Sequence, residues 1–140
     1  MANDIFCRII KGEVPSSVVY EDDDVIAILD ISQTTRGHTL VIPKEHYDSF
    51  LSCPSDVIAK VFAVARKIGQ AEISILGAKG VNILTNCGEA AGQTVMHFHV
   101  HVIPRYIGGE GGFQITMKSQ DTSGMDLPRL AYQIKEAIED

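Results

Sequence analysis

Apolar residues recur at the spacing of an α-helix in three segments of the chain. In the first segment, a cap at Asn3 or Asp4 and a stop at Gly12 predict a short helix. A long helix is predicted from Ser55 to about Ile75, because its apolar positions form one broad stripe. A third, C-terminal helix is predicted from an apolar face made of Leu127, Leu130, Ala131, Ile134 and Ile138.

Shorter apolar segments, rich in β-branched residues and bounded by turn residues, predict five strands. They are residues 17–21, 25–30, 38–43, 80–86 and a histidine-containing run within 94–106. Several neighbouring strands are joined by links of hairpin length, which favours a largely antiparallel sheet over alternating strand and helix units. No internal repeat or linker divides the sequence before a glycine-rich segment near its end, so we predict a single α+β domain over the whole chain.

The composition is that of a folded globular domain with a negative net charge. The 140 residues are 45% hydrophobic and 21% charged, and the formal net charge is -6. Because this charge repels a polyanion, we expect no binding to nucleic acid or to an anionic membrane surface, whereas one small nucleotide stays possible. A charged N-terminal stretch, apolar runs too short to span a membrane and three irregularly spaced cysteines predict a cytoplasmic protein.

Three of the five histidines, His97, His99 and His101, lie within the last predicted strand. Side chains alternate across a strand, so the three imidazoles share one face while Phe98 and Val100 point to the core. A core accommodates one buried histidine, but three in a row are a poor choice for packing or solubility. One metal ion bound by all three is a competing interpretation. However, residues i and i+4 of a strand lie about 13 Å apart, which strains such a site.

A row of imidazoles fits an extended anion, with the middle ring at the reacting centre. Neutral imidazole is a nucleophile near pH 7 and gives a phosphoramidate-like intermediate with phosphorus, which water later cleaves. The outer rings can donate hydrogen bonds to the phosphoryl oxygens. Because neighbouring positive charges oppose each other, we expect a mixed set of neutral and charged rings. Just upstream, a loop can bring backbone N–H groups close to an anion through Gly88, Gly92, Gln93 and Thr94.

At this point the sequence resembles the histidine triad (HIT) family. The resemblance rests on HFHVHVI and extends through CRIIKGEVPSSVVYEDDDVIAILDI, GHTLVIPKEH and GQTVMHFHVHVIPRY. It covers residues 4–106 and leaves 107–140 as a C-terminal extension. The Hint-type branch, which includes bacterial HIT proteins, is the most similar. This resemblance implies a homodimeric α+β fold in which the five-stranded sheet extends across the dimer and nucleotide sites face the central sheet.

The family resemblance also implies the reaction, which is hydrolysis or nucleotidyl transfer at the α-phosphate of purine nucleotide conjugates, as in a phosphoramidase acting on AMP or GMP conjugates. His99 is then the nucleophile that carries a covalent nucleotidyl group. His97 and His101 flank it, His38 supports the site, and Thr94 can donate to the departing amine or alkoxide. The implied substrate-binding residues are Asp30 at the ribose, Ile28 with Ile26 or Leu29 at the base, and Asn86, Gln93 and Thr94 around the phosphate.

Some bacterial HIT proteins bind zinc through a C-x-x-C segment and two histidines, and this chain keeps part of that pattern. The matching stretch here is DIFC, in which Asp4 stands in place of the first cysteine and Cys7 is retained. His46 and His97 match the two histidines. Zinc accepts a carboxylate oxygen, although a weaker site is expected after the loss of a thiolate. Zinc is therefore an implied cofactor, and no organic cofactor is expected. The alternative to a ligand role for Cys7 is that of a small apolar residue buried on the first helix.

Two other functions stay open at this point. The same chemistry can act on dinucleoside polyphosphates, and a zinc-stabilised nucleotide-binding regulatory module with little turnover can carry the same motifs. Asp30 has a structural alternative too, as a cap or turn residue at the end of its strand. The chain has no tryptophan, so the leaving-group preference linked to a C-terminal tryptophan in the Hint-type branch cannot be transferred. Residues 107–124 can form either a flap or a strand returning to a dimer interface.

Overall fold

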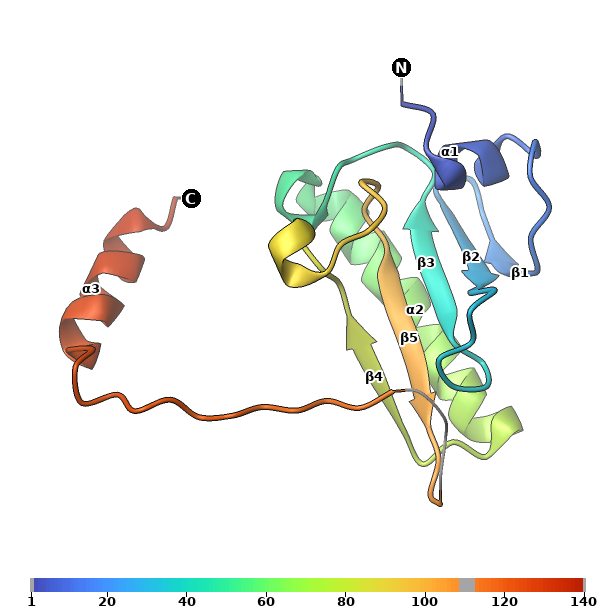
Figure 1. The fold of residues 1–140 in the computed structure, drawn as a ribbon. Coiled ribbons are helices and arrows are strands. Elements are labelled where there is room, and N and C mark those ends of the chain that lie inside the picture. The colour runs from blue at the N-terminus through green and yellow to red at the C-terminus, as the bar shows by residue number, and fades with distance from the viewer. Residues whose placement is uncertain (1, 109–112, 140) are drawn as a thin grey trace.

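The computed structural model describes residues 2–108 and 113–139, in which an antiparallel five-stranded sheet is combined with α-helices (Figure 1). Every strand pair is antiparallel, and the strand order is β1-β2-β3-β5-β4. The predicted α+β fold with a long helix is therefore confirmed. In chain order the elements are α1 (Ile5–Ile10), β1 (Val18–Glu21), β2 (Val25–Leu29), β3 (Thr39–Pro43), η1 (Phe50–Ser52), α2 (Ser55–Leu76), β4 (Gly80–Leu84), η2 (Glu89–Ala91), β5 (Val100–Arg105) and α3 (Leu127–Ala137).

The long helix α2 lies behind the sheet in Figure 1 and covers one face of it. Its buried positions recur three or four residues apart, as the apolar stripe in the sequence predicts. The helix ends at Gly77, whose φ of 76° is a left-handed conformation that glycine adopts without strain. The core on this face consists of Val25, Ala27, Val41, Val61, Val64, Ala65, Ile68, Phe98, Val100 and Val102.

The opposite face of the sheet carries the short helix α1 and a smaller apolar cluster. The carboxylate of Asp4 accepts a hydrogen bond of 2.9 Å from the backbone N–H of Cys7, so Asp4 rather than Asn3 caps the helix. The cluster on this face consists of Phe6, Ile26, Ile28, Leu40 and Ile42. Because side chains alternate along a strand, His101 of β5 points to this face, away from α2.

The histidine run is only partly a strand, which corrects the sequence-based expectation. Strand β5 begins at Val100, so His97, which lies in a bend, and His99 both precede the ladder. The β3–β5 register would place Phe98 opposite Pro43, which has no N–H to donate to the ladder. Pro43 therefore cannot donate to the carbonyl of Phe98, and the N–H of Phe98 donates to the carbonyl of Tyr47 at 2.6 Å. The alternation of side chains continues nevertheless, because Phe98 and Val100 both lie in the α2-side core.

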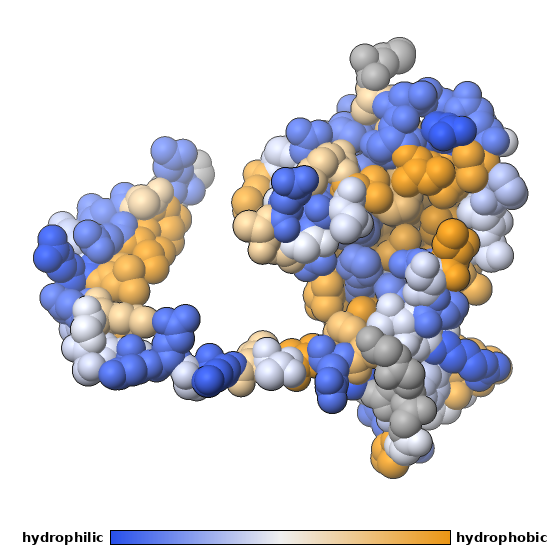
Figure 2. All heavy atoms as spheres, viewed as in Figure 1, coloured by the Kyte–Doolittle hydropathy of each residue, from blue (hydrophilic) through white to orange (hydrophobic). Residues whose placement is uncertain are grey.

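The C-terminal part of the described chain runs away from the sheet. After a stretch without regular structure, residues 113–122, and a turn at 123–125, the predicted third helix forms as α3 with Asp126 as its cap (Figure 1). Figure 2 shows apolar side chains gathered along one side of α3, and every described residue of this helix is exposed. The flap or returning strand predicted for 107–124 lies partly outside the described residues. Within the described ranges, no helix is both long and apolar enough to cross a membrane.

Candidate functional site

The side chain of His99 is held in one orientation by its own chain neighbourhood. Its Nδ1 lies 2.7 Å from the backbone carbonyl of His97, and only 8% of the residue is exposed. A carbonyl can only accept, so Nδ1 carries the ring proton and the lone pair resides on Nε2. The hydroxyl of Thr85 donates to the carbonyl of His99 at 2.7 Å and fixes the backbone at this point. The ring is thus pre-set in the tautomer that leaves Nε2 as a nucleophile.

A cavity of about 400 Å³ lies against this ring on the α1 side of the sheet. His99 and His101 form one part of its lining, and α1 supplies an apolar wall. Polar groups at the lining include the carboxylate of Asp30 and the hydroxyl of Thr94. The apolar part of the lining consists of Ile5, Phe6, Ile9, Val14, Ile28, Leu29, Leu40 and Val95. A concave site with an apolar wall and a few polar groups suits a small ligand that has both an apolar ring and polar substituents.

His101 is linked to the upstream His38 and through it to Asp30. His38 Nε2 lies 3.0 Å from His101 Nδ1, and 3.8 Å from a carboxylate oxygen of Asp30. The other ring nitrogen of His38 is buried and has no hydrogen-bond partner. One imidazole must therefore donate to the other, and the carboxylate next to them favours any positive charge that develops on the pair.

The protonation of these rings is shifted toward the neutral form. Burial lowers the pKa of His99. Burial and the neighbouring rings of His99 and His38 lower the pKa of His101 to about 4. Burial also lowers the pKa of His38, against an opposite effect of Asp30. His99, His101 and His38 thus share a shift toward neutral imidazole, which is the nucleophilic form, and the mixed set of charges expected for the three triad rings stays a prediction.

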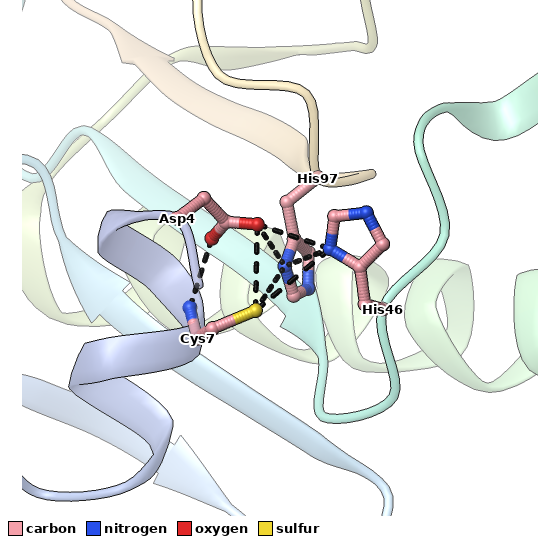
Figure 3. Close-up of side chains that lie close together, drawn as sticks. All are labelled: Asp4, Cys7, His46 and His97. Carbon is pink, nitrogen blue, oxygen red and sulfur yellow. Dashed lines mark hydrogen bonds and ion pairs between the residues drawn. The ribbon is translucent and has the colours of Figure 1, made fainter. Parts of the chain in front are cut away.

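His97 is placed apart from this cavity, in a cluster with Asp4, Cys7 and His46 (Figure 3). Its Nδ1 lies 3.2 Å from both His46 Nδ1 and an Asp4 oxygen, which is itself 3.0 Å from His46 Nδ1. The sulfur of Cys7 lies 3.4 Å from the Asp4 oxygen, 3.8 Å from His46 Nδ1 and 3.6 Å from His97 Nδ1. Figure 3 shows the four donor atoms facing one common centre.

The donor set of this cluster fits a tetrahedral zinc ion. Zinc bonds of about 2.0 to 2.1 Å to nitrogen or oxygen and about 2.3 Å to sulfur give tetrahedron edges of roughly 3.3 and 3.6 Å, close to the observed separations. His97 Nε2 lies 2.9 Å from the carbonyl of Pro43, and His46 Nε2 lies 2.9 Å from a carboxylate oxygen of Asp48. Both Nε2 atoms therefore donate, and both Nδ1 atoms face the centre, which is how metal-ligating histidines are oriented.

Contacts within the cluster shift the pKa values of Asp4 and Cys7. Burial acts to raise the pKa of Asp4, but the backbone N–H of Cys7 and the neighbouring His97 outweigh it and lower that pKa below its usual value. Burial and the adjacent Asp4 carboxylate raise the pKa of the Cys7 thiol. The carboxylate is thus ready to bind a cation, whereas the thiol must lose a proton when it does so.

Comparison with known proteins places this arrangement in a family. The family described as HIT domain matches residues 11–108. The chain belongs to the HIT family. A HIT family protein from Bacillus anthracis str. 'Ames Ancestor' has a crystal structure that matches with 44% sequence identity and a TM-score of 0.90, over 98% of this chain and 98% of that one. The fold, the extended C-terminal segment and α3 thus have a close counterpart in a solved structure.

Two other relatives of this HIT domain bear on its chemistry. A Zn-bound histidine triad family protein from Mycobacterium smegmatis has 40% sequence identity and a TM-score of 0.74, over 96% of each chain. The protein Adenylylsulfatase HINT3 from Arabidopsis thaliana is 42% identical over 101 residues, which are 72% of this chain and 51% of that protein. The relatives therefore include a zinc-bound protein and a protein named as an adenylylsulfatase.

The HIT domain brings most of the residues predicted for catalysis and substrate binding to one place. His99, His101, Thr94, Asp30 and Ile28 all line the cavity. His38 stands behind His101, as the second imidazole of a pair. These positions agree with the roles expected from the sequence, and the roles themselves stay predictions.

Three predicted residues are placed differently. His97 belongs to the zinc-type cluster, and its carbonyl accepts the hydrogen bond from the His99 ring. Gln93 lies buried with its side chain bound inside the protein: its oxygen accepts from Gly88 N–H at 2.8 Å, and its nitrogen donates to two backbone carbonyls. Asn86 does not line the cavity, and its amide lies next to Gly92. The side chain of Gln93 therefore holds backbone groups of the surrounding loops together.

Some residues of the site were not identified from the sequence. The α1 residues Ile5, Phe6 and Ile9 form a cavity wall, although their helical spacing had indicated only a buried face. Thr85 is a second case, because the pattern assigned it to a strand and gave no reason to expect a hydroxyl bound to His99. Contacts of this kind join segments distant in sequence, and no local spacing encodes them.

Proposed function

We propose that this HIT protein is a nucleotide hydrolase or nucleotidyl transferase that acts at the α-phosphate of purine nucleotide conjugates, in the manner of a phosphoramidase. The observation that carries the proposal is the His99 ring beside a cavity, with Nδ1 bound to a carbonyl and its nucleophilic Nε2 left available. The hydrolase activity in the name of the Arabidopsis thaliana relative supports this class of reaction.

In the proposed first step, His99 Nε2 forms a bond to the α-phosphorus as the bond to the leaving group breaks. The imidazole ring becomes positively charged, and the carbonyl of His97 stabilises this charge through Nδ1–H. Thr94 donates a hydrogen bond to the departing amine or alkoxide, which takes up a proton from water. In the second step, the oxygen of a water molecule bonds to phosphorus and gives up a proton to the solvent, the N–P bond breaks, and neutral His99 is restored.

The other groups at the cavity are proposed to bind the nucleotide. Asp30 offers only acceptors, which suits the two hydroxyls of a ribose. Ile28, with the apolar wall from α1, suits the flat and weakly polar base. The His101–His38 pair can donate one hydrogen bond to a phosphoryl oxygen from the outer nitrogen of His101, where negative charge develops. The substrate is then a conjugate of AMP or GMP.

Zinc is the proposed cofactor, held by Asp4, Cys7, His46 and His97. When bound it would act as a structural ion, since four protein ligands complete a tetrahedral shell and leave no open position for substrate. The fitting separations of the donor atoms and the zinc-bound relative from Mycobacterium smegmatis support the proposal.

A homodimer is part of the same proposal. Strand β4 forms one edge of the sheet, and an edge strand pairs readily with another chain. The apolar side of α3 is exposed, with 57% exposure at Ile134, and helices of this kind are stable when that side is covered. A second copy can extend the sheet and cover the helix. The cytoplasm is the proposed compartment, supported by three free cysteines.

The proposed activity is tested by turnover of two substrates under identical conditions. We expect faster cleavage of an adenosine phosphoramidate than of a diadenosine polyphosphate, and loss of both activities in His99→Ala. Faster cleavage of the polyphosphate would assign the enzyme to dinucleoside polyphosphates. Nucleotide binding with no turnover of either compound would contradict the enzymatic proposal and identify a binding module.

A further inference from the structure

The helix α1 belongs to two sites at once. Its cap Asp4 and Cys7, three residues apart, contribute to the zinc-type cluster. The intervening Ile5 and Phe6, together with Ile9, contribute to the wall of the nucleotide cavity. One turn of helix therefore separates the two sites, and no flexible linker lies between their residues. Any change in the position of α1 alters both.

Phe6 makes this connection directly. Its ring is 94% buried and packs edge-on against His99 at a centroid distance of 4.9 Å, and against His97 at 5.9 Å. One aromatic side chain thus contacts a ring of the cluster and the ring of the proposed nucleophile. Because buried rings pack closely, a displacement on the cluster side is transmitted to the cavity side.

His97 provides a second connection. Its Nδ1 points into the cluster, while its carbonyl accepts from His99 Nδ1 at 2.7 Å. Its Nε2 is held by the carbonyl of Pro43, so that the ring has little freedom apart from its cluster contacts. The residue that would bind the ion is therefore the residue that orients the nucleophile.

The helix α1 depends on tertiary contacts for its stability. It has six residues, whereas isolated helices need roughly 12 to 15 residues to be even marginally stable in water. A cation at the cluster would join Asp4 and Cys7 of α1 to His46 and His97 of the main body. Without it, these four side chains are joined only by their mutual contacts, such as the 3.2 Å contact between the Nδ1 atoms of His46 and His97.

We propose that metal occupancy of the Asp4–Cys7–His46–His97 cluster regulates nucleotide affinity at the His99 cavity, through α1 and His97. This inference rests on the proposed nucleotide site and deepens it, because it assigns a regulatory role to a cluster that touches no substrate. Coupling between two sites is reciprocal, so a bound nucleotide must raise the affinity of the cluster for the ion by the same factor.

The test uses the full-length protein stripped of metal with a chelator, and the same protein reloaded with Zn²⁺. Calorimetric titration with AMP should give an affinity about tenfold higher in the zinc-loaded protein, within the usual range of coupling between sites. Zinc titration with and without AMP should give the same factor. Amide hydrogen exchange at Cys7 and Arg8 should slow when zinc binds, which reports on α1 independently of any nucleotide.

Variants separate the coupling from other effects. His46→Ala removes a ligand that does not line the cavity, so it should bind AMP like the stripped protein and not respond to zinc. Glu45→Ala, one residue away and outside both sites, is the matched control and should respond like the wild type. Phe6→Leu keeps all four ligands and should reduce the coupling factor.

The outcomes distinguish this inference from the proposed function. Equal AMP affinity in stripped and loaded protein overturns the coupling and leaves the proposed activity intact. Exchange at Cys7 and Arg8 that does not change with zinc overturns the role of α1, whatever the ligand. Absence of AMP binding in both states overturns the coupling and the proposed nucleotide site together.

Discussion

At the scale of single residues, the lowered pKa of His99 predicts how activity changes with pH. Burial is the main cause of the shift, and the nucleophile must be neutral. The ordinary value is 6.5, so kcat/KM for an adenosine phosphoramidate should stay on its plateau as pH falls through 6.5. It should decline only at lower pH, where the ring gains its proton. The pH–rate profile measures this, and a midpoint at or above 6.5 would be inconsistent with the buried, neutral ring.

A second residue-scale prediction concerns the stability of the protein. Glu72 of α2 is buried, one of its carboxylate oxygens has no partner, and burial raises its pKa from 4.5 to about 7. The folded state therefore holds the proton more tightly than the unfolded state. The free energy of unfolding should fall by about 2 kcal/mol as pH rises from 4.5 to 7 through this group. Urea unfolding of the wild type and Glu72→Gln at pH 5 and pH 8 measures this.

The variant serves as the internal reference for this measurement. Glu72→Gln keeps the size of the side chain and removes its titration, so it should be about 2 kcal/mol more stable than the wild type at pH 8. At pH 5 the two proteins should be nearly equal. An equal difference at both pH values would show that Glu72 ionises freely in the folded protein.

At the scale of elements, α1 combines a helix cap with a proposed metal ligand in one residue, Asp4. Asp4→Cys would restore the two-thiolate pattern and should raise zinc affinity roughly tenfold. The same change removes the cap, so the metal-stripped variant should be less stable by about 1 kcal/mol. Chelator competition and thermal unfolding measure the two effects. Asp4→Asn is the control: it keeps the cap and should weaken zinc binding. Unchanged zinc affinity in both variants would argue against Asp4 as a ligand.

The elements also show how much the sequence could predict. Helix α2 and strands β2 and β3 follow directly from apolar periodicity, and their observed bounds differ from the predicted ones by a residue at most. The histidine run differs from its predicted strand. Pro43 lacks an N–H and cannot complete a ladder pair with Phe98, so the strand begins only at Val100. In this run, periodicity correctly predicted that Phe98 and Val100 face the core. It could not predict which group each backbone N–H and carbonyl would bond to.

The candidate site was predictable only in part, for a similar reason. The spacing of the three histidines, with the family resemblance, identified His99, His101 and Thr94, which meet at the cavity. The separation of His97 from the other two required the family pattern of zinc ligands, because strand geometry alone puts the three rings in one row. Gln93 was expected at the phosphate, whereas its amide binds backbone groups of its own loop and of Asp48. Loop packing of this kind has no periodic signal.

At the scale of the whole molecule, α3 is the element without a packing partner among the described residues, since all of its own described residues are exposed. We predict that a second copy covers its apolar side. Ile134→Asp should then shift the protein from dimer toward monomer, because a buried charge without a partner is unfavourable. Gln133→Asp, one residue away and off the apolar side, is the matched control. Sedimentation equilibrium measures both. A monomeric wild type would refute the dimer, and a dimer unaffected by Ile134→Asp would remove α3 from its interface.

The central claim is that His99 takes a nucleotidyl group onto Nε2, and the most direct measurement is the mass of the protein during turnover. Wild type and His99→Ala are mixed briefly with an adenosine phosphoramidate, quenched without acid and weighed intact. We predict an added adenylyl mass on the wild type, located on the peptide that contains His99 and absent from the variant. Turnover with no added mass on the wild type, or an adduct that persists in His99→Ala, would contradict the mechanism.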